Sequence, residues 1–296
     1  MSIFITGVES FLGKFLAKTL LERNINFEGI DLIKKNSYTK IYDICNKTLK
    51  ENIPKNINTI VHLAAIATSN DFKVDPKKAY EVNINGTINL IKSAIHNEIQ
   101  HIIFASSEWV YGEDKFEKKD EDSIIDFNKL GSEYALSKAL CENILQYYCS
   151  INNINCTILR FGIIYGPRET KKNWSAVESI LFNLYEKKEF ITVGSKKTAR
   201  RFIYVKDVAE GIISSLPLKG INVLNLTGDE LVSLEKIVEI GNEILKTKCK
   251  INEKDTNNFN LRDAKNDKIK KLTSWKPKFN IRFGAEKILE SFKVFY

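Results

Sequence analysis

The sequence predicts an α/β protein in which helices cover both faces of a parallel β-sheet. Two observations lead to this fold class. Short apolar runs alternate with helical periodicity through the first two-thirds of the 296 residues, and runs such as Ile102–Ala105 contain no polar residue. Alternating strands and helices predict βαβ units, and strands that helices bury on both faces are apolar throughout. No run of about 18 apolar residues is present, which disfavours a membrane span.

Each predicted element follows from the local pattern. Apolar runs predict strands at Ser2–Thr6, Asn26–Leu32, Asn58–Ala65, His101–Ser106 and Cys156–Ile164. Helical spacing of apolar residues predicts helices over Phe11–Arg23, about Pro76–Asn97 and about Leu130–Ser150. The charged stretch Glu113–Asp122 is predicted to be a solvated loop.

The pattern changes after Pro167. Residues 168–202 and 229–296 lack the regular alternation, whereas residues 203–228 return to it. We therefore expect residues 1–167 and 203–228 to form the sheet domain, and residues 168–202 and 229–296 to form a smaller cap.

Composition narrows the class of protein. Hydrophobic residues make up 43% of the chain and charged residues 28%, an ordinary globular balance. The amino terminus enters a strand-like run directly, without the pattern of a signal peptide. The five cysteines form no CxxC pair and the three histidines are dispersed, which indicates a reducing cytoplasm, no disulfide framework and no metal.

The net charge of +8 does not indicate a nucleic-acid partner. The chain has 45 Lys and Arg residues against 37 Asp and Glu, but the lysines are spread along its whole length. A nucleic-acid-binding protein gathers its basic residues on one face, with aromatic residues among them. The positive field would instead help to attract a diphosphate.

A glycine-containing turn lies between the first strand and the first helix. In Thr6–Gly13 the glycines stand at positions 7 and 13, and Ser10 occupies a position where the dinucleotide fingerprint normally has glycine. A tight turn here brings backbone N–H groups to a pyrophosphate at the positive end of the helix. Taken alone, the motif also fits a purely structural turn.

Asp31 supports the nucleotide-binding interpretation. It ends the second strand, 18 residues after Gly13, where a carboxylate accepts hydrogen bonds from the adenosine ribose hydroxyls. A carboxylate there repels a 2′-phosphate and so favours NAD over NADP. Lys34 and Lys35 follow closely and weaken this preference.

Tyr134 and Lys138 are candidates for acid–base chemistry. Their spacing of four residues places them on one face of a predicted helix. A phenol has a pKa near 10, and a lysine ammonium beside a positive nicotinamide ring lowers it. Such a pair on its own is a common accident. Ser107 strengthens the hypothesis because it follows a buried strand, whose carboxyl end faces the ligand crevice of a parallel sheet.

Together these motifs resemble the extended short-chain dehydrogenase/reductase family, in its NAD-dependent epimerase/dehydratase branch. The similarity extends almost end to end and includes segments 83–87, 159–167, 200–207 and 268–277. It implies a Rossmann fold, a doubly wound parallel sheet with a smaller C-terminal substrate-binding cap. Ser107, Tyr134 and Lys138 match the catalytic triad of the family.

The resemblance also implies which residues bind the cofactor NAD. They are Gly7, Ser10, Phe11, Leu12, Gly13, Asp31, Asp43, Ile44, Leu63, Ala64, Ala65, Asn83, Tyr134 and Lys138.

The substrate implied by the resemblance is a nucleoside-diphosphate sugar held by the cap. Arg200 matches the position that meets the diphosphate, for which a guanidinium fork is suited, and Arg262 is a second candidate anchor. Ile163 stands where many members have a substrate-binding asparagine.

Glu108 and Trp109 are the most informative departure from the family pattern. Similar epimerases carry small residues at both positions, whereas 4,6-dehydratases carry Asp and then Glu. One carboxylate and one indole disfavour full dehydratase chemistry. Glu108 is a candidate acid or a ligand for a sugar hydroxyl, and it equally fits a structural role.

The leading functional hypothesis is an NAD-dependent sugar-nucleotide epimerase that acts at C4 through a transient 4-keto intermediate. The alternatives are an NAD(P)-dependent 4-dehydrogenase or 4-ketoreductase that exchanges its cofactor each turn, a 4,6-dehydratase using Glu108, and a non-catalytic dinucleotide-sensing protein. The resemblance further implies a homodimer formed through the two long helices. The sequence does not define the base or the sugar.

Overall fold

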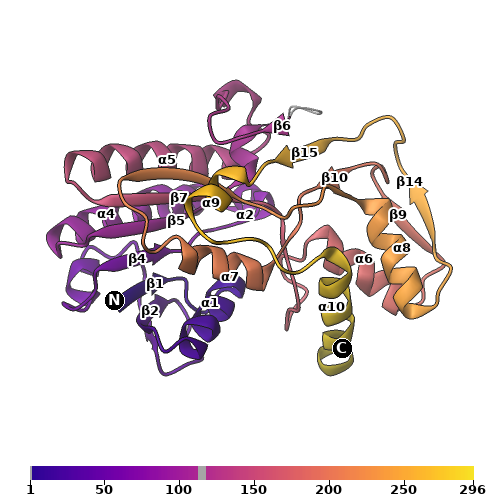
Figure 1. Ribbon diagram of the computed structural model, residues 1–296, viewed down its shortest axis with the longest axis horizontal. Coiled ribbons are helices and arrows are strands. Elements are labelled where there is room, and N and C mark those ends of the chain that lie inside the picture. The colour runs from indigo at the N-terminus through magenta and orange to yellow at the C-terminus, as the bar shows by residue number, and fades with distance from the viewer. Residues whose placement is uncertain (1, 113–117) are drawn as a thin grey trace.

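A parallel sheet forms the centre of the protein (Figure 1). The computed structural model describes residues 2–112 and 118–296, so residues 113–117 of the predicted loop Glu113–Asp122 lie outside it. Within the described residues the sheet has seven strands in the order β12-β7-β5-β4-β1-β2-β3. The strands are β1 (Ser2–Thr6), β2 (Asn26–Asp31), β3 (Thr39–Ile41), β4 (Thr59–His62), β5 (His101–Ser107), β7 (Asn155–Phe161) and β12 (Ile221–Leu226). This arrangement confirms the predicted fold class.

The strand order reverses beside β1. From β1 the chain adds β2 and β3 on one side and then crosses to β4 on the other, so that Ile5 lies opposite both Gly29 and Val61. In open α/β sheets ligands bind at such a reversal, outside the carboxyl ends of the strands. The fold therefore places a ligand crevice over Thr6, at the end of β1.

Helices cover the two faces of the sheet. Helices α1 (Phe11–Glu22) and α7 (Val205–Ser214) pack on one face, and α4 (Gly86–His96) and α5 (Glu133–Ile151) pack on the other (Figure 1). Side chains of a strand alternate between these cores: Ile3 and Ile5 lie in the first and Phe4 lies in the second. Both kinds of side chain are buried, which explains why the strands are apolar without alternation.

The helix predicted at Pro76–Asn97 is divided. Asp75 caps α3 (Pro76–Tyr80), and a π-helical turn (Glu81–Asn85) then separates α3 from α4. A shorter helix, α2 (Ser69–Val74), precedes them. A π-turn shifts the periodicity by one residue and is frequently found at functional sites. The apolar spacing of the sequence is too coarse to reveal that shift.

The C-terminal part of the chain forms the smaller cap, on the right in Figure 1. Its strands are β9 (Phe190–Val193), β10 (Ala199–Arg200), β13 (Val232–Ser233), β14 (Lys250–Glu253) and β15 (Leu261–Ala264). Two further strands, β8 (Ile164–Tyr165) and β11 (Ile203–Tyr204), pair with each other in parallel. The helices of the cap are α6 (Ala176–Tyr185), α8 (Leu234–Leu245) and α10 (Ile281–Phe295), which share a third hydrophobic core. The short strand β6 (Lys118–Lys119) joins the cap sheet in the order β13-β10-β15-β6.

The chain returns from the cap to the sheet before its last helix. Ile269 of α9 (Asp267–Leu272) and Trp275 lie in the core that α1 and α7 share. The Trp275 indole N–H donates to the carbonyl of Asp207 at 2.9 Å. This segment fixes the cap relative to the sheet. Among the described helices, none has the length and apolar character to span a bilayer.

Candidate active site

Three predicted catalytic side chains lie together at the carboxyl end of β5. Ser107 is its last residue, and Tyr134 and Lys138 lie one turn apart on α5. The Ser107 hydroxyl lies close enough to the Tyr134 phenol to lower its pKa. Lys138 Nζ donates to the carbonyl of Ala105 at 2.7 Å and lies 6.0 Å from the centroid of the Tyr134 ring. A phenol, a hydroxyl and an ammonium group therefore line the same side of the candidate site.

Desolvation controls the acidity of these groups. It raises the pKa of Tyr134 to about 12, against the opposing effect of the hydrogen bond from Ser107. It lowers the pKa of Lys138 to about 8. Since a nearby positive charge stabilises phenolate, Tyr134 requires additional positive charge to act as a base near neutral pH. A nicotinamide cation is a group of that kind.

Asn83, in the π-turn, is hydrogen-bonded to the helix that carries Tyr134 and Lys138. Its Oδ1 accepts from the amide of Ile66 at 2.8 Å, and its Nδ2 donates to the carbonyl of Ile66 and to Ser137 Oγ, both at 3.0 Å. Ser137 adjoins Lys138 on α5. Through these hydrogen bonds Asn83 links the segment that follows β4 to α5, the helix that carries Tyr134.

The turn between β1 and α1 has the geometry of a dinucleotide cradle. Gly7 has a φ of +75°, and a Cβ there would lie 2.8 Å from the amide nitrogen of Ala64. Ser10 caps α1, and its hydroxyl accepts from the amide of Gly13 at 3.0 Å. The amides of Phe11 and Leu12, in the first turn, have no preceding helical carbonyl to bond. Free amides of this kind at a helix N-terminus can bind a pyrophosphate.

The residues predicted to contact adenosine lie at or after the ends of β2 and β3. The carboxylate of Asp31 accepts from the amides of Glu9 at 2.9 Å and Leu32 at 2.8 Å, and its remaining lone pairs suit ribose hydroxyls. Asp43 accepts from the amide of Cys45 at 2.9 Å. The side chain of Ile44 is buried in the second core, so only its backbone is available to a base.

Leu63, Ala64 and Ala65 follow β4 beside the glycine turn and are half-buried. His62, the residue before them, is held by two hydrogen bonds. Its Nδ1 shares one with Thr6 Oγ1 at 2.7 Å, and its Nε2 shares one with Thr87 Oγ1 at 3.1 Å. Burial lowers the pKa of His62 to about 3. The neutral ring is thus a fixed structural element of the cofactor crevice.

The two predicted substrate arginines are neighbours in the cap. Arg200 of β10 pairs with Arg262 of β15 in the parallel register, so both side chains project from the same face. Arg200 donates to the carbonyls of Ala199 at 2.8 Å and Asn260 at 3.0 Å. The Arg262 guanidinium lies 3.9 Å from the centroid of the Trp109 ring. Trp109 therefore orients one of the arginines.

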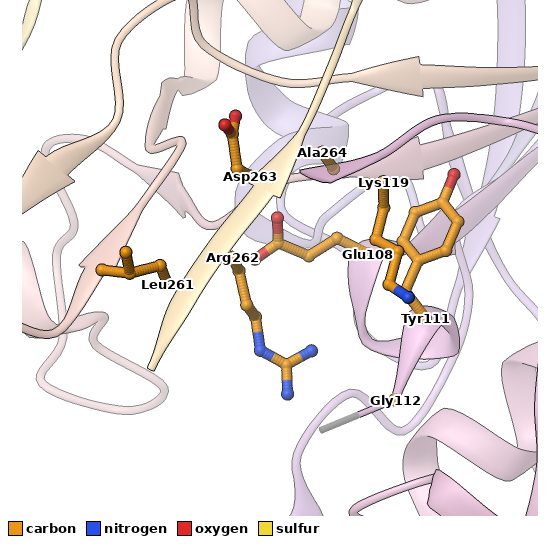
Figure 2. A pocket seen from close by; sticks show the side chains of 8 residues that line it. All are labelled: Glu108, Tyr111, Gly112, Lys119, Leu261, Arg262, Asp263 and Ala264. Atoms are coloured by element: carbon orange, nitrogen blue, oxygen red, sulfur yellow. The ribbon is translucent and has the colours of Figure 1, made fainter. Parts of the chain in front are cut away.

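Glu108 faces the cap from the 3₁₀ turn Glu108–Tyr111 (η3). It lines a pocket with residues of that turn, β6 and β15, namely Tyr111, Gly112, Lys119, Leu261, Arg262, Asp263 and Ala264. Figure 2 shows its side chain reaching toward β15. Only 1% of Glu108 is exposed, and among the described residues neither carboxylate oxygen has a hydrogen-bond partner. Burial raises its pKa to about 7, although Arg262 and Arg200 oppose the shift.

The sequence analysis missed a buried ion pair beneath this turn. Arg160 of β7 pairs with Glu142 of α5 and donates to the hydroxyl of Tyr111 at 3.0 Å. The hydroxyl of Ser106 donates to Glu142. The signals were an arginine inside an otherwise uncharged strand and a glutamate one turn after Lys138. A charge in a buried strand requires a partner.

The structure shows no metal centre or disulfide in the part of the chain it describes. No cluster of three or more His, Cys, Asp and Glu side chains occurs there, and Cys45, Cys141, Cys149, Cys156 and Cys249 are free thiols.

A Rossmann sheet with a dinucleotide cradle beside a serine, tyrosine and lysine defines a nicotinamide-dependent enzyme of the short-chain dehydrogenase/reductase class. The model of the NAD dependent epimerase/dehydratase family matches residues 3–222. The chain belongs to this family, and the cofactor of the family is NAD, as the sequence predicts.

Known relatives cover nearly the whole chain. It is 28% identical to UDP-glucuronate 4-epimerase of Thermodesulfobacterium geofontis, over 96% of this chain and 93% of that protein. Two solved structures share the fold. The UDP-glucose 4-epimerase of Thermotoga maritima with UDP-glucose has a TM-score of 0.87 at 21% identity, with 99% of each chain covered. The UDP-glucuronic acid 4-epimerase of Bacillus cereus, with a fluorinated UDP-glucuronic acid and NAD, has a TM-score of 0.88 at 24% identity, with both chains fully covered.

Proposed function

We propose that the chain is an NAD-dependent sugar-nucleotide epimerase that inverts C4 of a nucleoside-diphosphate sugar. The observation that carries this proposal is that Ser107, at the carboxyl end of β5, meets Tyr134 and Lys138 of α5, with Lys138 Nζ 6.0 Å from the centroid of the Tyr134 ring. The names of the relatives support UDP-sugars as the first substrates to test.

In this proposal Tyr134 is the proton carrier. Its phenolate removes the proton from the C4 hydroxyl, and Ser107 donates a hydrogen bond that aligns the oxygen of that hydroxyl. The ammonium of Lys138 favours the phenolate. When bound, NAD supplies the acceptor and donor of the C4 hydride. The 4-keto sugar then rotates in the site, so that C4 presents its opposite face. Tyr134 returns the proton to the oxygen of the new hydroxyl.

The remaining predicted site residues hold the two nucleotides. The turn from Gly7 to Gly13, with Asp31, Asp43 and the chain after β4, holds NAD, and Asn83 keeps that chain in place. Arg200 and Arg262 hold the substrate diphosphate, for which paired guanidinium groups are well suited. The cap, which we place at residues 168–202 and 229–296, closes over the sugar nucleotide.

A 4,6-dehydratase is the second candidate, because burial holds Glu108 near the pKa that suits a general acid. Trp109 argues against it, since its indole is stacked on Arg262 where a dehydratase needs a base.

We further propose a cytoplasmic homodimer. The long helices α4 and α5 lie side by side on one face of the sheet, and α5 exposes 63% of Tyr147 and 59% of Ile151. Association through this face would cover both side chains. Light scattering that gave the mass of a single chain would contradict the dimer.

The function is tested by denaturing the purified protein and identifying the released nucleotide, followed by product analysis with UDP-glucose and UDP-glucuronate. Near-stoichiometric NAD and a C4 epimer would support the epimerase. A 4-keto-6-deoxy product would establish the dehydratase instead. An empty protein that oxidises or reduces a sugar nucleotide only with added NAD or NADP would identify an exchanging dehydrogenase or ketoreductase.

A further inference from the structure

We infer that Glu108 selects the sugar: its carboxylate favours a neutral hexose and excludes a uronate. This inference rests on the proposed epimerase function and concerns the class of sugar that the same site accepts. The relatives leave that class open, because they include enzymes named for UDP-glucose and for UDP-glucuronate.

The position of Glu108 is the first argument. It directly follows Ser107, which we place on the reacting hydroxyl, so its side chain projects from the same end of β5. It extends toward β15 of the cap, as Figure 2 shows. A sugar held between Tyr134 and the cap arginines therefore lies against Glu108.

The unsatisfied oxygens are the second argument. Both oxygens of Glu108 are buried without a hydrogen-bond partner among the described residues. A buried carboxylate in that state is costly. The hydroxyls of a neutral hexose are donors that would satisfy these oxygens, whereas the carboxylate of a uronate offers acceptors only.

Charge is the third argument. The cationic groups that act on Glu108 are Arg262, Arg200 and Arg201. Arg201 forms an ion pair with Asp263, and Arg262 lies over Trp109. At pH values above its pKa of about 7, Glu108 places one negative charge beside the cap arginines. A uronate would bring a second carboxylate into the same buried space, and like charges at close range in a desolvated site repel strongly.

The test compares UDP-glucose with UDP-glucuronate in the wild-type protein and in Glu108→Gln. Glutamine retains the shape and an acceptor oxygen but removes the charge. We expect the wild type to favour UDP-glucose in kcat/KM by at least about tenfold, and Glu108→Gln to reduce that ratio by about tenfold or more, which corresponds to about 1.4 kcal/mol. A wild-type enzyme that prefers UDP-glucuronate, or an unchanged ratio in the variant, would overturn the inference.

A binding measurement separates this inference from the proposed function. Calorimetric titration of the NAD-loaded protein gives the Kd of each sugar nucleotide without turnover. If neither is epimerised, the proposed function fails, but the ratio of the two Kd values and its change in Glu108→Gln still decide the role of Glu108. Glu51→Gln makes the same change at an exposed glutamate outside the predicted site and is the matched control. It should leave the ratio of the two Kd values unchanged.

Discussion

The guanidinium of Arg160 donates three hydrogen bonds to the carboxylate of Glu142, at 2.7, 3.1 and 3.2 Å. Both residues are at most 4% exposed. Glu142 lies one turn beyond Lys138 on α5, and Arg160 lies on β7 opposite Ser106. The pair therefore sets the position of the helix carrying Tyr134 against the strand carrying Ser107.

Breaking this pair from one side should be costly. Arg160→Met leaves a buried carboxylate without its partner, and we expect a loss of about 3–5 kcal/mol in the free energy of unfolding. Replacing both residues, as Arg160→Met with Glu142→Leu, should cost less than the sum of the two single changes. Urea unfolding of the four proteins measures this coupling. Additive losses would show that the two residues act independently.

Tyr134→Phe tests the proposed proton carrier. Loss of the phenolic oxygen should reduce kcat by about 10²–10⁴-fold, the usual contribution of a general acid–base group. The NAD content should fall far less than the activity, because most of the residues that we expect to bind NAD lie outside α5. Tyr185→Phe, in the cap, is the control and should retain activity. Comparable activity in Tyr134→Phe would refute the assignment.

Gly7→Ala tests the dinucleotide cradle, with Gly220→Ala as a matched control. Both glycines have positive φ, +75° and +72°, but only at Gly7 would a Cβ meet backbone, whereas nothing lies within 4 Å at Gly220. Each change should cost about 1–2 kcal/mol in backbone strain, and Gly7→Ala about 1–3 kcal/mol more from the contact. Thermal melting and the content of bound NAD measure this. Equal effects would contradict the close approach of Gly7 to Ala64.

The pH dependence of stability should reveal the burial of Glu108. Its pKa is about 7 in the folded protein against 4.5 for the unperturbed group, so the folded state binds more protons between these values. Stability therefore falls as the pH rises through this window, by up to about 3 kcal/mol. Glu108→Gln removes this loss and should be more stable than the wild type at pH 8, with the difference vanishing near pH 4.

The two buried histidines, His62 and His101, change stability with pH in the opposite direction to Glu108. The comparison with the Glu108→Gln variant is therefore necessary. Burial lowers their pKa values to about 3 and about 4, so both are neutral when folded, and stability is lost as the pH falls below 6.5. Both proteins share these histidines, so the difference between them isolates Glu108. A difference that did not vary with pH would contradict the shift.

Local patterns predicted the sheet and the family well. The apolar strands and the spacing of Tyr134 and Lys138 follow from periodicity, because buried strands and helix faces impose it. The π-turn at Glu81–Asn85 was not predictable, since it changes the hydrogen-bonding pattern without changing the apolar spacing. The contact of Trp109 with Arg262 joins residues 153 positions apart, and no local signal reports such a distance.

The sequence by itself determined the class of fold, the family and its cofactor, since these follow from motifs a few residues long whose chemistry is local. The tertiary structure alone decided the environment of each side chain. Glu108 could have faced solvent, but the packing of β15 against η3 buries it beside the cap arginines. Glu142 could have been a surface charge, but the crossing of α5 over β7 places it on Arg160. Burial and long-range pairing depend on how distant elements meet, and they set the charge and reactivity that the motifs leave open.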